Sequence, residues 1–147
     1  MKKSVNFQNM KYKQTEIPSV EIKARRDLRR YVMEEYSKNV QGKTVKNKDR
    51  GLTVFFGADG KNELAHGRAI YAKKAALVQC IVKLMEVAEY NNFGQRKDKD
   101  QENVFGYANF KAKVYINGVL EHVRITVVVK ANGKAYYCHE VNIIKKK

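Results

Sequence analysis

Residues 107–144 decide the fold, and they run YANFKAKVYINGVLEHVRITVVVKANGKAYYCHEVNII. Two Asn-Gly pairs, Asn117-Gly118 and Asn132-Gly133, separate runs in which apolar and polar residues alternate. Asn-Gly between such runs is the strongest short-range hairpin signal, because a type I′ turn requires positive φ at both central residues. The stretch therefore predicts an antiparallel meander of three strands joined by two tight turns.

The two faces of this meander follow from residue parity, because successive side chains of a strand point to opposite sides. One face should be apolar, formed by Ala108, Phe110, Ala112, Val114, Ile116, Val123, Ile125, Val127 and Val129. The other face, which we call the outer face, should mix cations with aromatic and hydrogen-bonding groups: Tyr107, Asn109, Lys111, Lys113, Tyr115, His122, Arg124, Thr126, Val128 and Lys130.

The overall charge points to an anionic partner. Thirty Lys and Arg residues stand against fifteen Asp and Glu, which gives a formal net charge of +15. A hydrophobic fraction of 44% is typical of a globular chain and argues against wholesale disorder. We expect RNA or another nucleic acid as the partner, because the cations also fall on one sheet face. The alternative is a lysine-rich surface that serves only solubility.

Several function classes are excluded by what the sequence lacks. Cys80 and Cys138 fit no disulfide framework, and His66, His122 and His139 fit no metal-binding spacing, so we expect no metal and no cofactor. The chain shows no signal peptide and no run approaching ~20 apolar residues. We therefore expect a cytoplasmic protein that does not contact membranes.

The amino-terminal part predicts an arm and a basic helix. Residues 1–17 are polar and aperiodic, which indicates a flexible arm, whereas residues 18–147 are expected to form a single domain. A helix is predicted from Ser19, as its N-cap, to about Tyr36, because apolar residues recur at helical spacing. Its remaining surface carries five cations: Lys23, Arg25, Arg26, Arg29 and Arg30.

The middle of the chain predicts a hairpin and a long helix. Two short strands are expected at residues 43–46 and 52–56, broken off by the loop residues 57–60. Apolar residues at helical spacing predict a core helix over residues 68–90, which should pack on the apolar face of the meander. Residues 91–102 are expected to form a turn and a charged loop. Helix, hairpin, helix and three strands indicate an α+β fold with helices on one face of an antiparallel sheet.

A metal-free ribonuclease site can be assembled from the available side chains. In such a site a base takes the proton of a ribose 2′-hydroxyl, an acid protonates the leaving oxygen, and cations hold the phosphate oxygens. His66 or His122 would transfer protons, because the pKa of histidine lies close to neutral pH. Arg124 would clamp the phosphate, and Tyr136 would act as a supporting donor.

His66, His122 and Arg124 also have a plain structural interpretation. His66 is equally typical of a surface histidine at the start of a helix, and His122 is more typical of an exposed residue after a turn. Arg124 would serve as a cross-strand partner of Glu121 or Glu140.

A binding module without catalysis is the second hypothesis. Lys111, Lys113 and Lys130 would hold phosphates, while Tyr107 and Tyr115 would stack on bases, at about 1–3 kcal/mol per base. A third hypothesis is a protein-interaction module of a larger mobile-element protein.

The order of elements resembles the phage-type nuclease domains of the barnase–EndoU–colicin–RelE assemblage. The motifs that carry the resemblance are QGKTVKN at 41–47, GLTVFF at 51–56, His66 ahead of the core helix, ING at 116–118 and GKAYY at 133–137. The resemblance covers about residues 20–144. It implies metal-independent RNA cleavage at the exposed sheet face, and such domains occur in phages, mobile elements and toxins.

The resemblance also sets the expected architecture. We expect one or two amino-terminal helices and the long core helix on one face of an antiparallel sheet of about four to five strands, ending in the meander. The assemblage shares no catalytic set, so only the residue types are carried over, and an inactive member stays open. An immunity or antitoxin-like protein that covers the outer face also stays open, as does the oligomeric state.

Overall fold

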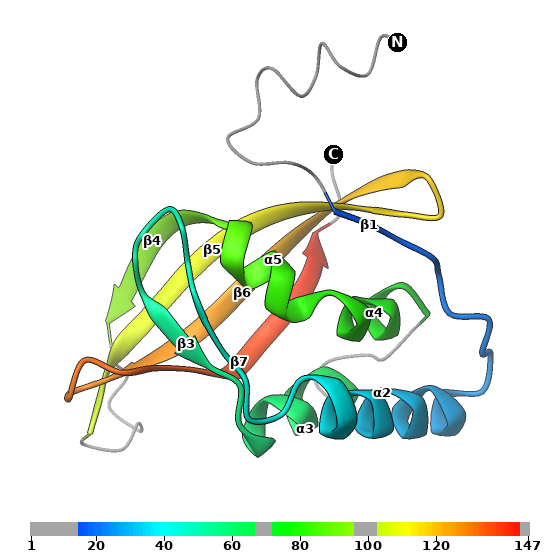
Figure 1. The fold of residues 1–147 in the computed structure, drawn as a ribbon, viewed down its shortest axis with the longest axis horizontal. Helices are drawn as coiled ribbons and strands as arrows, with labels where there is room; N and C mark the ends of the chain where they lie inside the picture. Colours follow the sequence, from blue (N-terminus) through cyan, green and yellow to red (C-terminus); the bar gives the residue numbers. More distant parts are fainter. Residues whose placement is uncertain (1–14, 67–71, 96–102, 145–147) are drawn as a thin grey trace, which may run out of the picture.

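A seven-stranded sheet curls around the helices in the computed structural model of the chain, which describes residues 15–66, 72–95 and 103–144 (Figure 1). Within these ranges, the side chains of five residues lie outside the description: His66, Cys138, His139, Glu140 and Asn142. The elements follow in the order β1 (Thr15–Ile17), α2 (Arg25–Asn39), β2 (Thr44–Lys46), β3 (Thr53–Phe55), α3 (Ala58–His66), α4 (Ala72–Ala76), the 3₁₀ helix η1 (Leu77–Gln79), α5 (Ile81–Val87), β4 (Glu89–Gln95), β5 (Val104–Ile116), β6 (Val119–Lys130) and β7 (Ala135–Ile144).

The α+β class is confirmed, but the expected sheet was wrong in size and direction. The strand order is β1-β5-β6-β7-β3-β2, and β4 also pairs with β5. The pairs β1–β5 and β3–β7 are parallel, whereas the other pairs are antiparallel. Turn signals detect hairpins between neighbouring strands only. The two parallel pairs join segments that are distant in sequence, so these pairings could not be predicted from turn motifs.

One of the two predicted type I′ turns is present. Asn117 and Gly118 both have positive φ, at 52° and 80°, as a type I′ turn requires. At the second turn only Gly133 is in this region, with φ 86°. The Gly133 N–H donates to the Lys130 carbonyl (2.9 Å), and the Lys130 N–H donates to the Lys134 carbonyl (2.8 Å). This pattern is a three-residue loop with a glycine bulge, so the prediction of a type I′ turn was wrong here.

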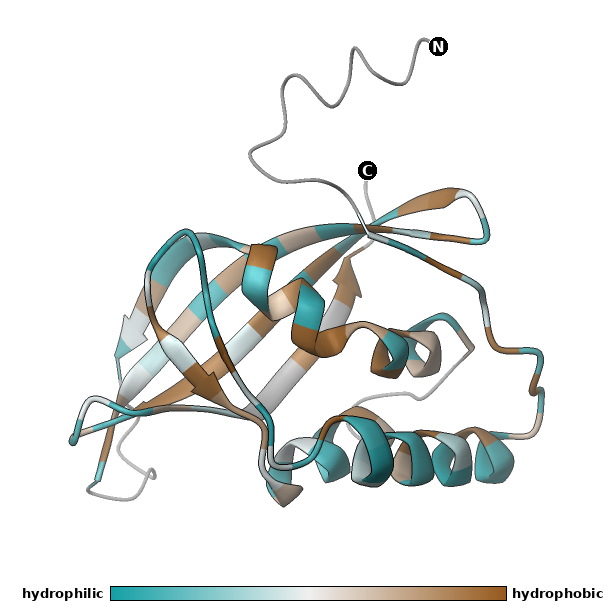
Figure 2. Cartoon of the chain, in the orientation of Figure 1, coloured by the Kyte–Doolittle hydropathy of each residue, from teal (hydrophilic) through white to brown (hydrophobic). Residues whose placement is uncertain are grey.

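The predicted faces of the meander are confirmed. Phe110, Val114, Val123, Ile125 and Val127 are each 0% exposed and belong to the main core cluster. On the helix side, this cluster also takes in the predicted stripe of Leu77, Ile81, Leu84 and Met85. Figure 2 shows the resulting alternation of hydrophobic and hydrophilic positions along the strands.

The predicted core helix is interrupted, and it ends early. Residues 72–87 form α4, η1 and α5 in succession, while residues 89–95 form β4, which pairs with β5 in the antiparallel sense. Tyr90 packs edge-on against Phe110, with ring centroids 5.7 Å apart, on the core side of β5. The polar segment after the helix therefore becomes a strand, because it finds hydrogen-bonding partners on β5.

The first helix begins five residues later than predicted. Helix α2 starts at Arg25, and its N-cap Ala24 makes no side-chain capping bond. The Ser19 amide instead donates to Asn117 Oδ1 (3.1 Å), and Asn117 Nδ2 donates to Ser19 Oγ (2.8 Å). Ser19 thus ties the segment after β1 to the β5–β6 turn. Strand β1 takes up the end of the expected arm, whose residues 1–14 lie outside the description.

Helix α3 occupies residues expected to form a loop. It begins at Ala58 and buries Leu64 and Ala65 completely on the core side. His66 is its last residue, so the expected position at the start of a helix was wrong. None of the described helices is long and apolar enough to cross a membrane.

Candidate nucleic-acid interface

Four of the predicted site residues come together on the outer face. Strands β5 and β6 pair in a register that sets Lys111 opposite Arg124 and Lys113 opposite His122. The four residues occupy two adjacent cross-strand rows, and we call them the cationic patch. Lys111 and Arg124 are exposed, while Lys113 and His122 are half-buried. Cations placed directly opposite each other, as Lys111 and Arg124 are, destabilise a sheet, and a bound anion would relieve this repulsion.

The acidic partners considered for Arg124 lie elsewhere or are not described. The Glu121 carboxylate pairs with the Lys73 ammonium of α4, on the helix side of the sheet. Glu140 stands opposite Thr126, one row away from Arg124, and its side chain lies outside the description. Glu89 of β4 stands opposite Lys111 and is the acidic residue in register with the patch.

A neutral hydrogen-bonded row follows the patch. Thr126 Oγ1 donates to Asn109 Oδ1 (2.7 Å), and Asn109 Nδ2 donates to Asn92 Oδ1 (2.7 Å). These two bonds cross β6, β5 and β4 in sequence. They fix the side-chain orientations on the outer face and separate the patch from the aromatic end of the sheet.

The aromatic end of the outer face holds Tyr107, Val128 and Tyr136. Tyr107 is 9% exposed and clusters with Val104 and Val128, so its ring is packed and does not offer the stacking surface that was predicted. Tyr136 is half-buried and stands opposite Val128 on one side and Phe55 on the other. The rings of Phe55 and Tyr136 meet edge-to-face, with centroids 5.9 Å apart at 86°.

The predicted catalytic set is not assembled in one place. Val128, the β6 partner of Tyr136, lies four residues beyond Arg124, about 13 Å along the strand. His66 ends a helix that packs on the core side, so its backbone lies across the sheet from Arg124. Only His122 is placed beside Arg124, two residues away on the same strand face.

The remaining predicted residues flank these groups. Tyr115 is half-buried and stands opposite Leu120 on β6 and Glu16 on β1. Lys130 is half-buried at the far end of β6, opposite Val104. Among the described residues, no group of three or more His, Cys, Asp and Glu side chains could hold a metal ion.

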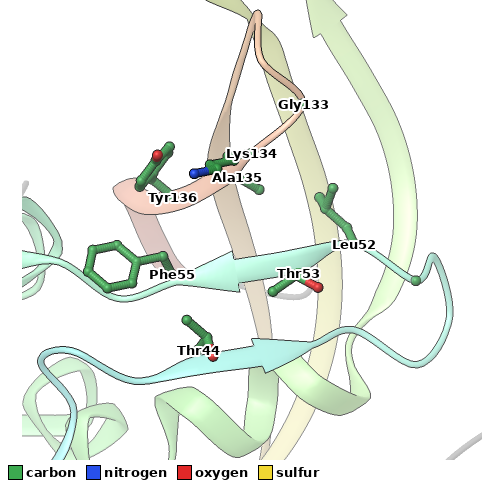
Figure 3. A pocket seen from close by; sticks show the side chains of 9 residues that line it. Thr44, Leu52, Thr53, Phe55, Gly133, Lys134, Ala135 and Tyr136 are labelled. Atoms are coloured by element: carbon green, nitrogen blue, oxygen red, sulfur yellow. The ribbon is translucent and has the colours of Figure 1, made fainter.

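Sequence reasoning missed a groove next to Tyr136. It is open, has a volume of about 710 Å³, and runs between the β2–β3 hairpin and the start of β7 (Figure 3). Its lining comprises Thr44, Gly51, Leu52, Thr53, Phe55, Gly133, Lys134, Ala135 and Tyr136. The sequence contained a signal for the groove, because Phe55 stands between two apolar strand residues, Val54 and Phe56. Both of these flanking residues are 0% exposed. Parity therefore turns Phe55 outward, and it is 37% exposed.

Comparison with known proteins places the domain in a family. The family model of large polyvalent protein-associated domain 3 matches residues 23–137, from just before α2 into β7. No match to the chain was found among curated proteins or among solved structures. The expected association with phages and mobile elements is confirmed at the level of this family, whereas the nuclease assemblage is not. The chain belongs to the large polyvalent protein-associated domain 3 family, a phage and mobile-element associated domain.

Proposed function

We propose that this domain binds single-stranded nucleic acid, RNA in the first instance, across the outer face of its sheet. The observation that carries the proposal is the register of β5 and β6, which sets Lys111 opposite Arg124 and Lys113 opposite His122. The pairing of Lys111 with Arg124 is unfavourable in the free protein and favourable once a phosphate lies between these two cations.

The shape of the surface favours a single strand over a duplex. The patch lies on a sheet, and within the described residues no helix or loop projects from this face to enter a duplex groove. Exposed or half-buried rings at Phe55, Tyr115 and Tyr136 offer π-faces on which unpaired bases can stack. The cations of α2 lie on the helix side and do not extend this surface.

Binding of a fluorescently labelled single-stranded RNA, measured by anisotropy at low salt, tests the proposal. Arg124→Ala should weaken binding several-fold, because it removes a phosphate contact. Arg26→Ala is the matched control, since it removes the same exposed side chain from α2 on the helix side. Equal losses in the two variants, or no binding by the wild type, would overturn the proposal.

Metal-independent RNA cleavage is a second candidate, favoured by the position of His122 beside Arg124. A phosphate held by Arg124 and Lys113 would lie next to the imidazole, which could take the 2′-hydroxyl proton. The proton donor to the leaving oxygen would be Lys113 or Tyr115, because Val128, the β6 partner of Tyr136, lies six residues from His122, about 20 Å along the strand.

Incubation of RNA with the protein in EDTA distinguishes the two candidates. Cleavage by the wild type that disappears in His122→Ala and persists in His66→Ala would establish the enzyme. Binding without cleavage would leave the domain as a binding module, and the proposed acid–base pair on this face would be wrong.

A further inference from the structure

We infer that the groove beside Phe55 and Tyr136 receives one unpaired nucleobase and marks one end of the nucleic-acid footprint. This inference rests on the proposed binding function and adds a specific subsite to it.

The groove is built where two distant parts of the chain meet. Strand β3 joins β7 in parallel through only two register pairs, Val54 with Ala135 and Phe55 with Tyr136. The β6–β7 loop at Gly133 and the end of the β2–β3 turn at Gly51 flank this short junction. The volume of about 710 Å³ is of the size that small-molecule sites commonly have, and is ample for a nucleoside.

Aromatic side chains form the wall of the groove. Because the rings of Phe55 and Tyr136 are nearly perpendicular, a base stacked on one ring would meet the edge of the other. Gly57 helps to hold this arrangement, since a Cβ added there would come 3.1 Å from Phe55 Cε2. Phe55 is 37% exposed, so part of its surface is available to a ligand.

The polar lining fits a nucleotide. Lys134 is exposed beside Tyr136, and Figure 3 shows its amine on the side of the two rings. Thr44 and Thr53 also line the groove, and their side chains carry hydroxyl groups that can bond to base edges. No Asp or Glu is among the lining residues, so nothing in the lining repels a phosphate.

The groove lies on the same sheet face as the cationic patch, two cross-strand rows away from Arg124. A single cross-strand row runs from Val128 through Tyr136 and Phe55 to Thr44, on the face that carries Arg124. The neutral row of Asn109 and Thr126 lies between the row of Val128 and the row of Arg124. A strand whose phosphates lie on Arg124 and Lys111 can therefore pass over this row and place a later base in the groove.

The test uses the whole domain and a short single-stranded RNA with one 2-aminopurine, moved from position to position. Stacking on an aromatic ring quenches or shifts the fluorescence of this base, so one position should respond far more than the others. Phe55→Ala should abolish that response and weaken binding about 5- to 150-fold, while the dependence on salt stays the same. Phe55→Leu, which keeps an apolar side chain for folding, should show the same loss.

Phe105→Ala is the matched control. Phe105 is 62% exposed, packs on Phe93 with centroids 5.5 Å apart, and is not among the residues that line the groove. Removal of the Phe105 ring should leave both RNA binding and the 2-aminopurine fluorescence response unchanged. If the wild type binds but both Phe55 variants bind equally well, the groove is not a base subsite and the binding function stands. If the wild type fails to bind at low salt, both proposals fail.

Discussion

Asn47 shows how one side chain joins two elements. It is 0% exposed, and its Nδ2 donates to the carbonyls of Met85 and Ala88, at 2.8 Å each, where α5 ends. Its Oδ1 accepts from the Arg50 amide (2.7 Å), which closes the β2–β3 turn. The last carbonyls of a helix have no partner within the helix, so Asn47 satisfies groups that would otherwise be buried and unpaired. The turn that frames the groove is thereby anchored to the core.

Asn47→Ala should lower the free energy of unfolding by about 2–4 kcal/mol, because it removes three hydrogen bonds and leaves two buried carbonyls unsatisfied. Urea denaturation followed by circular dichroism measures this change. Asn39→Ala is the control, because Asn39 is exposed and donates to Glu35 at the end of α2. Its effect should stay within about 0.5 kcal/mol. Equal effects of the two variants would contradict the anchoring role.

Cys80 illustrates a residue whose chemistry is suppressed by burial. Its side chain is 7% exposed, and desolvation raises the pKa of the thiol from 9.0 to about 12. A raised pKa means that the folded state keeps its proton where the unfolded state has lost it. The contribution of the protonated Cys80 thiol to the free energy of unfolding is therefore fully present below pH 9. It is lost as the pH rises toward 12.

In a Cys138→Ser background, the Cys80 thiol should therefore resist Ellman's reagent at pH 8 and react at once after addition of denaturant. The absorbance of the released thiolate measures both rates. Rapid reaction of the folded protein at pH 8 would show that Cys80 is accessible.

Helix α3 is an element whose position depends on one glycine. A Cβ at Gly60 would lie 2.3 Å from the Tyr137 carbonyl and 2.5 Å from the Tyr36 hydroxyl. The Tyr36 hydroxyl itself donates to the Gly57 carbonyl (2.7 Å), just before the helix. The helix thus packs directly against the backbone of β7, and this close approach is possible only without a side chain.

Gly60→Ala should destabilise the domain by about 1–3 kcal/mol, although the same change at an open helical site would stabilise it by up to about 1 kcal/mol. The sign of the shift in thermal midpoint is the measurement. Asn62→Ala, at an exposed position of α3, should be neutral or slightly stabilising. A Gly60→Ala variant that melts above the wild type would contradict the packing of α3 on β7.

Across the whole molecule, charge is distributed over both sides of the sheet, yet the proposed interface uses one side. Within the described residues, the proposed RNA path passes five cations: Lys111, Lys113, Arg124, Lys130 and Lys134. Each phosphate contact with a single strand contributes about −0.7 to the slope of log K against log salt concentration. Five contacts would therefore give a slope of about −3.5.

A salt titration of RNA binding to the wild type should yield that slope at pH 8. A much steeper slope would mean that cations of α2 also contact the strand. A slope near zero would mean that binding does not depend on phosphates, and the outer face would lose its proposed role.

The sequence by itself determined the local features of the fold. Alternation fixes which side of each meander strand is buried, and Asn117-Gly118 specifies its turn through the backbone conformations that only such residues adopt readily. The helical spacing of Leu77, Ile81 and Leu84 likewise identifies the core side of the central helices. These signals depend only on residues close together in sequence. They can therefore be interpreted without knowing which strands or helices pack against each other.

Only the tertiary structure decided the pairings over long distances. The polar segment 89–95 became a strand because β5 offered hydrogen bonds, and Gly60 became helical because Tyr137 offered a surface. The same holds for the candidate site. The sequence suggested Arg124 and Tyr136 as members of one cluster, whereas the register separates them by two rows and brings Phe55 to Tyr136 instead. Parity gives the face of a residue, but its neighbours on that face depend on strand order and register, which arise from packing of the whole chain.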